Sequence, residues 1–352
     1  MTSAVLPSPP PQRAPVQRSE GVWHAAWKRL LKDRVGIASL AVVAVFIVLI
    51  VLTAMGAVAR GWQAEVGVPN ARPGFMGAAP PEAAAVIEVP KGANVDLSDV
   101  DPLAPRYKEW AERAAKLKTE EAPRAQTLPL GGDRLGRDVL VKAMKGTQTS
   151  VFVGLMGALF AAVIGTLLGA LAGFFGGKVG DFLEWLYNVF TAIPDILLIL
   201  AFAAVFGRGV GSVAIILSLV GWTGLYRQVR AEFLKHSVRE YVRAAEAIGA
   251  SSMSRMFKHI LPNVSHVIFV RMSLLVVGFI KYEVILSYLG LGVGVDDVSW
   301  GTMLAEAQSE LILGYWWQLA AATAFMAVFI TAFSLMTDAL RDALDPKLRG
   351  LE

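Results

Sequence analysis

The chain has no cysteine among its 352 residues. It can therefore form neither a disulfide framework nor a thiolate metal site. Histidine is also scarce, and the four histidines lie in or near basic segments, so none is expected to pair with another along a path through the apolar runs as a metal site. They are His24, His236, His259 and His266.

A nucleotide-binding signature is missing as well. The motif G-x-x-x-x-G-K-[ST], whose backbone cradles phosphates, does not occur in the sequence. The segment GGKVG at residues 176–180 lacks the first glycine and follows an apolar run. No Ser/His/Asp arrangement is accompanied by supporting motifs, so the sequence disfavours an enzyme and predicts no catalytic residue.

Charged residues make up only 18% of the chain, whereas hydrophobic residues make up 55%. This balance is typical of a polytopic membrane protein. The net charge of +4 is modest, and the basic excess lies in loops, so no nucleic-acid partner is expected. The first apolar run begins near Gly36 and is too long for the h-region of a signal peptide, so no cleavable signal is expected.

Apolar runs long enough to cross a bilayer predict an all-α, polytopic membrane helix bundle with six transmembrane helices. The six are expected at residues 36–58, 150–176, 182–206, 213–226, 264–291 and 316–339. Pro194 interrupts the third run, but neighbouring helices can satisfy the carbonyl group that a proline leaves free.

Polar segments divide the chain around these runs. Residues 1–35 are expected to form a tail that ends in an interfacial helix, with Trp27 and Leu30 on its apolar face; alternatively, this helix extends the first transmembrane helix, which occupies 36–59. In the long loop 60–147, the first half looks extended and residues 105–121 predict a short helix. The helical core spans 148–345, includes a polar loop at 231–263, and is followed by a tail at 346–352.

Small residues recur at every fourth position of the second apolar run. Such a stripe is typical of a helix that packs closely against another helix in a membrane. Its members are Gly157, Ala161, Gly165, Gly169, Gly173 and Gly177.

The polar loop predicts two short helices separated by a glycine. The first covers 239–248 and ends at Gly249, which can adopt a left-handed cap without a Cβ penalty. The second runs from Ser251 to Leu261 and is ended by Pro262. Arg243 lies one turn from both Glu240 and Glu246, which supports the first helix. An apolar stripe on that helix contains Tyr241, Ala244, Ala245 and Ile248.

Lysine and arginine gather in the N-terminal segment, in the loop around residues 227–258 and in the C-terminal tail, and are absent from the loop 292–315. The positive-inside rule then predicts that both termini and the polar loop lie in the cytoplasm. The loops 60–147 and 292–315 are expected in the periplasm.

The polar loop resembles the EAA loop of ABC importer permeases, in which Glu-Ala-Ala is followed by a glycine and an Ile/Leu-Pro end. The matching residues are Ala244, Ala245, Gly249, Ile260, Leu261 and Pro262, while Arg243 stands where the family has the acid. Two further segments resemble signatures of the dipeptide/oligopeptide permease family: LPLGGDRLGRDVL at 128–140 and TDALRDALDPKLRG at 337–350. In the former, Asp133 and Gly136 predict a tight turn, with direct substrate contact as the alternative.

The resemblance implies the second (C-type) permease subunit of a binding-protein-dependent importer with the ABC type I importer permease fold, in a bacterial inner membrane. It implies a homologous second permease, two ABC ATPase subunits and a periplasmic substrate-binding protein as partners, besides membrane lipid. ATP and Mg would be bound by the ATPase subunits, and no cofactor by this chain. The loop would be the coupling element that contacts an ATPase, through Tyr241, Arg243, Ala244, Ala245, Glu246, Ile248, Gly249, Ala250 and Ser251.

Charges inside the apolar runs are candidates for the substrate pathway, because a charge in a membrane is costly unless it faces a cavity or a partner. Asp195, Lys281 and Glu283 are such charges. Lys281 and Glu283 are two residues apart and point to different sides of their helix, so no pair is expected between them. Glu283 either lines the pathway or packs against the second permease.

The family favours peptides as substrates, while a metal chelate or another solute stays open. A secondary transporter or channel that is not driven by ATP is the alternative function, although neither an inverted repeat nor paired broken helices are evident. A third possible function is that of a membrane anchor whose long outer loop is the functional part.

Overall fold

The computed structural model describes residues 27–78, 101–116 and 123–344. Within them the chain is mostly helical, and it confirms the predicted membrane helix bundle. Five helices have the length and composition of a membrane span: α2 (Arg34–Ala54), α4 (Val139–Phe175), α7 (Val210–Ser237), the helix from Ser252 through α10 (Leu261–Tyr288), and α12 (Trp317–Leu344). The predicted tail at 346–352 and the first part of the predicted interfacial helix, before residue 27, lie outside the described residues.

The third predicted span is broken. Helices α5 (Gly177–Thr191) and α6 (Asp195–Phe206) meet at an angle of 84°, and the number of spans is six if this pair counts as one. Pro194 has extended backbone angles (φ −55°, ψ 132°) and lies directly before α6. The interruption is thus a sharp corner, and Asp195 becomes the first residue of α6.

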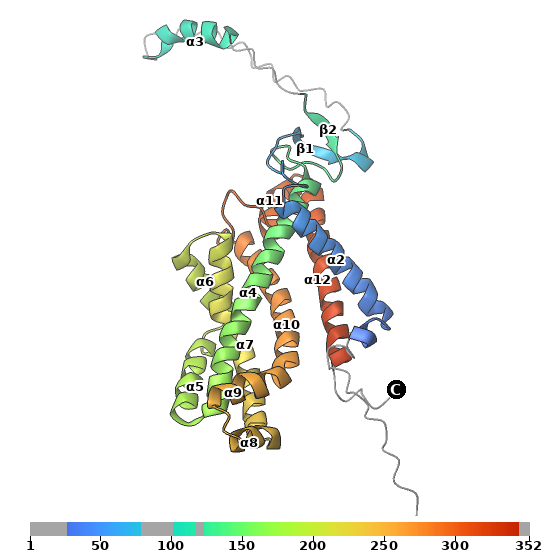
Figure 1. Cartoon of the computed structure of the whole chain (residues 1–352). Helices are drawn as coiled ribbons and strands as arrows, with labels where there is room; N and C mark the ends of the chain where they lie inside the picture. The colour runs from blue at the N-terminus through green and yellow to red at the C-terminus, as the bar shows by residue number, and fades with distance from the viewer. Residues whose placement is uncertain (1–26, 79–100, 117–122, 345–352) are drawn as a thin grey trace, which may run out of the picture.

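Helix α4 lies at the centre of the bundle and packs along α7 (Figure 1). Its 37 residues span about 55 Å, well beyond the roughly 30 Å of a bilayer core. It begins eleven residues before the predicted start at Ser150, because the Asp138 carboxylate caps it by accepting from the backbone N–H groups of Leu140 and Val141. Helix α2 packs against α12 and α4.

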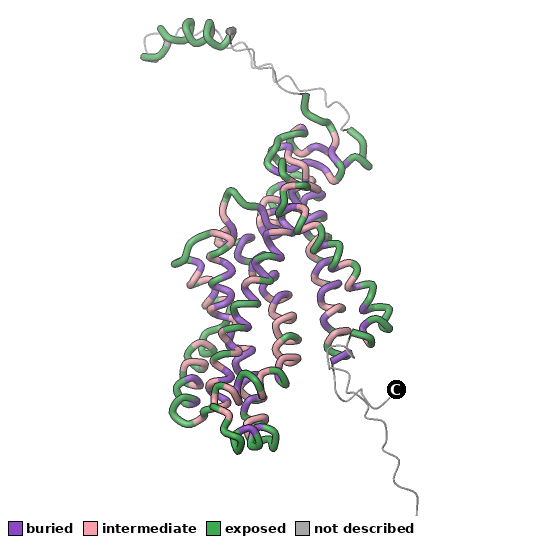
Figure 2. The backbone as a smooth tube through the Cα atoms, in the orientation of Figure 1, coloured by how far each residue is buried: buried purple, intermediate pink, exposed green. Residues whose placement is uncertain are grey.

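The small-residue stripe brings α4 and α7 into contact, as predicted. A Cβ atom at Gly165, Gly169 or Gly173 would lie 2.5–2.7 Å from a backbone oxygen of α7. Gly177 does not belong to this contact, because no atom lies within 4 Å of its would-be Cβ and its φ is positive. Burial is accordingly concentrated along α4 and α7 (Figure 2).

One end of the bundle, here called the sheet end, carries the long loop. Strand β1 (Gly67–Pro73) pairs in parallel with β2 (Ala125–Leu128), and the 3₁₀ turn Gly74–Met76 follows β1. Helix α3 (Ala104–Lys116) confirms the short helix predicted in this loop. Helix α11 (Trp300–Ile312) was not predicted: residues 292–315 were expected to be a loop, but Ser299 caps this helix in a capping box with Thr302.

The opposite end, here called the α8 end, carries α8 (Glu240–Ala247), α9 (Ser252–Ser254) and the π-helix Arg255–Ile260. The predicted loop 231–263 is shorter than expected, because α7 continues to Ser237. The described part of the N-terminal segment breaks before α2, where the Asp33 carboxylate caps the helix by accepting from the Val35 backbone N–H. The N-terminal helix therefore does not simply extend the first span.

Candidate functional sites

Gly249 separates α8 from α9 in a left-handed conformation with φ +86°, as predicted. No atom lies within 4 Å of its would-be Cβ, so the glycine is required by the backbone and not by crowding. After Ala250, the hydroxyl of Ser251 accepts from the Ser254 backbone N–H at 3.2 Å and caps the next helix. The helix–glycine–helix unit of the sequence is therefore present.

The two faces of α8 differ from the predicted stripe. Tyr241, Ala244 and Ile248 are exposed, with Ile248 at 85%, and they form what we call the open face of α8. Ala245 is only 4% exposed and packs inward together with Val242. The four predicted residues thus do not share one face, because the bundle already covers Ala245.

The inward side of α8 belongs to a core cluster that we call the coupling cluster. It joins α8, the π-helix, α10, α7 and α4 through nine buried residues: Val242, Ala162, Ala170, Leu225, Val229, Phe233, Met256, Ile260 and Val264. Tyr241 also contacts α7, because its hydroxyl lies 2.8 Å from Nδ1 of His236. A displacement of α8 would therefore be passed to three spans through close-packed side chains.

Glu246 forms an ion pair with Arg255 across the glycine, at 2.6 Å. The predicted pairs of Arg243 with Glu240 and Glu246 are absent among the described residues, and Arg243 is exposed. Glu246 pairs with Arg255 because the π-helix follows α9 directly and brings Arg255 back toward α8.

Pro262 does not end the second helix, contrary to the prediction. The π-helix Arg255–Ile260 runs directly into α10, and Pro262 occupies the first turn of that helix. A proline has no N–H to donate, and its ring crowds the carbonyl four residues earlier. The π-helix directly before it widens the helical ladder, and this combination lets the chain continue.

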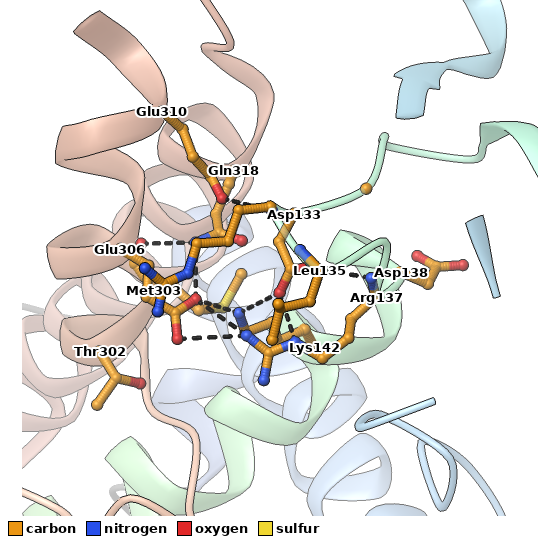
Figure 3. A network of polar contacts seen from close by, with 12 residues as sticks. Asp133, Leu135, Arg137, Asp138, Lys142, Thr302, Met303, Glu306, Glu310 and Gln318 are labelled. Atoms are coloured by element: carbon orange, nitrogen blue, oxygen red, sulfur yellow. Dashed lines mark hydrogen bonds and ion pairs between the residues drawn. The ribbon is translucent and has the colours of Figure 1, made fainter. Parts of the chain in front are cut away.

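The sheet end contains a buried group of charges, here called the sheet-end cluster (Figure 3). The Asp133 carboxylate accepts from Arg137 Nε at 2.6 Å and from Lys142 Nζ at 2.7 Å, and Lys142 also contacts Glu306 of α11. The side chains of Asp133 and Lys142 are 0% and 1% exposed. The Glu310 carboxylate accepts from the Arg134 backbone N–H at 2.9 Å. The cluster holds α11 against the start of α4.

Electrostatics support this arrangement. Burial alone would raise the pKa of Asp133, but Lys142 and Arg137 outweigh it and hold this pKa below its ordinary value of 3.8. Asp133 also forms the predicted tight turn, because its Oδ1 accepts from the backbone N–H groups of Leu135 and Arg137. Gly136 has φ +79° in that turn. The turn is therefore structural, and the sequence alone did not reveal that Lys142 and Glu306 complete it.

Glu283 is fully buried between α10, α4 and α11. Its carboxylate accepts from the Ser150 hydroxyl at 2.7 Å and from the Ser287 hydroxyl at 2.6 Å. The Ser150 hydroxyl in turn accepts from the Trp300 backbone N–H at 3.2 Å. Glu283 thus packs inside this chain, which differs from both alternatives that the sequence left open.

The family model "Binding-protein-dependent transport system inner membrane component" matches residues 165–350. The oligopeptide transport system permease protein OppC of Bacillus subtilis (strain 168) is 34% identical over 247 residues, which are 70% of this chain and 81% of that protein. This chain belongs to the family of binding-protein-dependent transport system inner membrane components. It is therefore an ABC transporter permease and a multi-pass protein of the bacterial inner membrane, not an enzyme.

Two further relatives extend the match. The dipeptide transport system permease protein DppC of Lactococcus lactis subsp. cremoris is 30% identical over 322 residues, covering 92% of this permease and 90% of that protein. OppC of Escherichia coli (strain K12) is 38% identical over 219 residues, covering 62% of this chain and 72% of that protein. Among solved structures, a chain of the MetNI methionine ABC transporter in an inward-facing conformation covers 54% of this chain at 18% identity, with a TM-score of 0.40.

The other predicted pathway residues of the permease are not brought together with Glu283. Asp195 is exposed at the start of α6, and Lys281 is exposed on α10. Arg271, also on α10, escaped the sequence analysis although it lies in the same apolar run, and a charge in such a run is a signal for a functional residue in a membrane protein. Among the described residues, no group of three His, Cys, Asp or Glu side chains could hold a metal ion.

Proposed function

We propose that this permease is one of two homologous membrane subunits of an importer that moves peptides across the inner membrane. Oligopeptide and dipeptide permeases are its relatives, and the aligned segments cover most of the chain. Two separate ATPase subunits bind ATP and Mg, and a periplasmic binding protein delivers the substrate. An importer of this family requires such partners in general; their number and nature here are part of the proposal.

The observation that carries the coupling role is the two-sided character of α8. Its open face, with Tyr241, Ala244 and Ile248, offers an apolar surface with one small residue. Its other face is seated in the coupling cluster, which reaches α4, α7 and α10. An ATPase that binds the open face and moves α8 would therefore also move α4, α7 and α10. The exposed cation of Arg243, beside the open face, supplies an electrostatic contact where relatives with the usual motif would have an acid.

The proposed orientation places the α8 end in the cytoplasm and the sheet end in the periplasm. Lysine and arginine are frequent in residues 227–258 near the α8 end, whereas the short loop 292–315 has none. The loop 60–147 also contains lysine and arginine, but a loop of this length is largely exempt from the rule. The wild-type chain has no cysteine, so a Ser251→Cys variant carries a single label site. An impermeant thiol reagent should leave this site unlabelled in intact cells and label it in inside-out vesicles. Labelling of this site in intact cells would show that the α8 end faces the periplasm and would overturn the proposed orientation.

The coupling role is tested with Gly249→Val in the assembled transporter. A β-branched residue at φ +86° costs about 1–3 kcal/mol of local strain, so α8 should tilt relative to α9. We expect normal membrane insertion, little ATP-driven peptide uptake, and ATPase activity that no longer responds to the loaded binding protein. Gly211→Val is the matched control, because Gly211 also has open space around it but lacks a positive φ.

Uptake and ATPase activity are measured side by side in reconstituted vesicles. If the Gly249→Val variant couples ATP hydrolysis to uptake as the wild type does, the helix–glycine–helix unit does not transmit the motion of the ATPase. Peptide uptake that proceeds with an ion gradient and without ATP would overturn the importer proposal itself.

A further inference from the structure

We propose that a cavity between α6, α7 and α10 is a substrate subsite for a small zwitterion, with Asp195 taking its ammonium group and Arg271 its carboxylate. This inference rests on the proposed transport function and names the chemistry that the path would select. The cavity has a volume of about 220 Å³. Its walls carry both charges together with Thr223, Gly224, Gly278 and Tyr282.

Neither charge is neutralised by the protein. Among the residues that the structure describes, Asp195 and Arg271 have no ion pair or side-chain hydrogen bond, and Nε of Arg271 is buried without a partner. A charged side chain in the middle of a membrane helix costs about 2.5–3.5 kcal/mol on the insertion scale. Arg271 is such a charge, and Asp195, of opposite sign, lies at the start of α6. The two face one cavity and are not paired with each other, which indicates a ligand that carries both complementary charges.

The contacts of α7 with α10 locate the guanidinium of Arg271. Phe279 lies against Gly221, and the Arg271 guanidinium lies against Gly224, three residues nearer the α8 end of α7. Three residues of helix correspond to about 4.5 Å. Tyr282, which lines the same cavity as Asp195, lies three residues from Phe279 toward the sheet end.

Asp195 and Arg271 thus line one cavity without an ion pair between them among the residues that the structure describes. The amino and carboxylate groups at the two ends of a short peptide can reach two separate charges, since each residue of the peptide adds at most about 3.6 Å.

Glycines shape the site. The would-be Cβ of Gly224 would lie 2.9 Å from a terminal nitrogen of Arg271, so Gly224 leaves room for the guanidinium beside α7. Gly278 lines the cavity and has no atom within 4 Å of its would-be Cβ. The wall of α10 at this level thus lacks a side chain where a ligand would lie.

A second cavity continues toward the α8 end. It has a volume of about 530 Å³, and its lining includes Glu232, His266 and Arg341. Arg271 and Leu274 line both cavities. Arg271 consequently stands at the junction, where its guanidinium can hold a carboxylate before the solute passes on toward the α8 end.

A direct test uses a Gly278→Cys variant of the assembled transporter, in which the new thiol is the permease's single label site. The rate of maleimide labelling is measured without and with an excess of dialanine, N-acetyl-dialanine or dialanine amide, in nucleotide-free and ATP-bound complexes. The binding protein is omitted, so its own selectivity does not enter. We expect dialanine to slow labelling several-fold in at least one state, and each capped form, which lacks one charge, to slow it much less.

Removing each of the two charges should then affect the protection by a different capped probe. In the same background, Asp195→Asn should make dialanine protect no better than N-acetyl-dialanine, while dialanine still protects better than its amide. Arg271→Gln should make dialanine protect no better than its amide, while dialanine still protects better than N-acetyl-dialanine. Lys281→Gln is the matched control, because Lys281 lies on the same helix but lines neither cavity. Equal protection by all three probes, or none by dialanine, overturns the subsite. So does a fall in melting temperature in both variants with an unchanged protection pattern, which would make the two charges structural.

ATP-driven peptide uptake in vesicles separates this inference from the proposed function. Uptake without protection by dialanine overturns the subsite and leaves the function standing. Protection without uptake of any peptide supports the subsite and overturns the peptide assignment. Absence of both overturns both.

Discussion

The Ser150 hydroxyl donates a 2.7 Å hydrogen bond to the Glu283 carboxylate and so joins α4 to α10 inside the bundle. The same hydroxyl accepts from the Trp300 backbone N–H and draws the start of α11 into the contact. One buried acid thereby positions three helices that are far apart in the sequence.

Replacing Glu283 with Ala should lower the stability of the permease. The hydroxyls of Ser150 and Ser287 would lose their acceptor, and each unsatisfied buried polar group costs about 1–3 kcal/mol. We expect a clear drop in the melting temperature of the purified complex. Glu283→Gln should retain more stability, and Lys281→Ala on the exposed side of α10 should be neutral. A wild-type melting temperature in Glu283→Ala would contradict the structural role.

The sheet-end cluster should make stability depend on pH. The pKa of Asp133 is depressed, so the folded state binds that proton less tightly than the unfolded chain. Its stabilisation is therefore present above about pH 4 and is lost as the pH falls through the folded-state pKa. Melting curves from neutral to acid pH should show this loss in wild type, and less of it in Asp133→Asn.

Removing the cation of the same cluster should be costly at neutral pH. Lys142→Met leaves Asp133 buried without its amine, and breaking a buried pair from one side costs about 3–5 kcal/mol. The exposed pair of Glu65 and Arg124, at 2.9 Å, is the control. Glu65→Gln should change the free energy of unfolding by less than about 1 kcal/mol. Equal effects of the two substitutions would show that burial of the cluster is unimportant.

Ala244 and Ala245 should behave differently when enlarged to Leu, although they are adjacent. Ala244 lies on the open face of α8, so Ala244→Leu should leave the permease stable and weaken only ATPase binding. Ala245 is 4% exposed and faces inward, so Ala245→Leu should overfill the space beneath α8 at a cost of about 1–3 kcal/mol. Pull-down of the ATPase and melting of the permease separate the two effects. Identical behaviour would contradict the two-sided character of α8.

Gly169→Ala should separate α4 from α7. The added Cβ would lie 2.7 Å from the Tyr226 backbone oxygen, and a backbone atom cannot move aside as a side chain can. We expect less assembled complex and a lower melting temperature. Gly211→Ala has open space and serves as the control. If both variants assemble like wild type, the stripe does not determine the packing.

Much of the local structure was predictable. Apolar runs locate spans because the bilayer demands length and hydrophobicity, which are properties of consecutive residues. The four-residue spacing of Gly165, Gly169 and Gly173 indicated a contact face, and Gly249 indicated a positive φ. Helix α11 was missed because its capping box and helix formers stand in a segment that was judged only by polarity.

The sequence by itself determined the order of the apolar runs, the helix–glycine–helix unit and the small-residue stripe, since each depends on neighbours along the chain. Tertiary structure alone decided which side of α8 is buried, that Ser150 meets Glu283 across 133 positions, and that Asp195 and Arg271 face one cavity. The physical reason is that such contacts depend on the register and closeness of packed helices. A change of one residue in register turns a side chain by about 100° around its helix, and no local pattern records which register the bundle adopts.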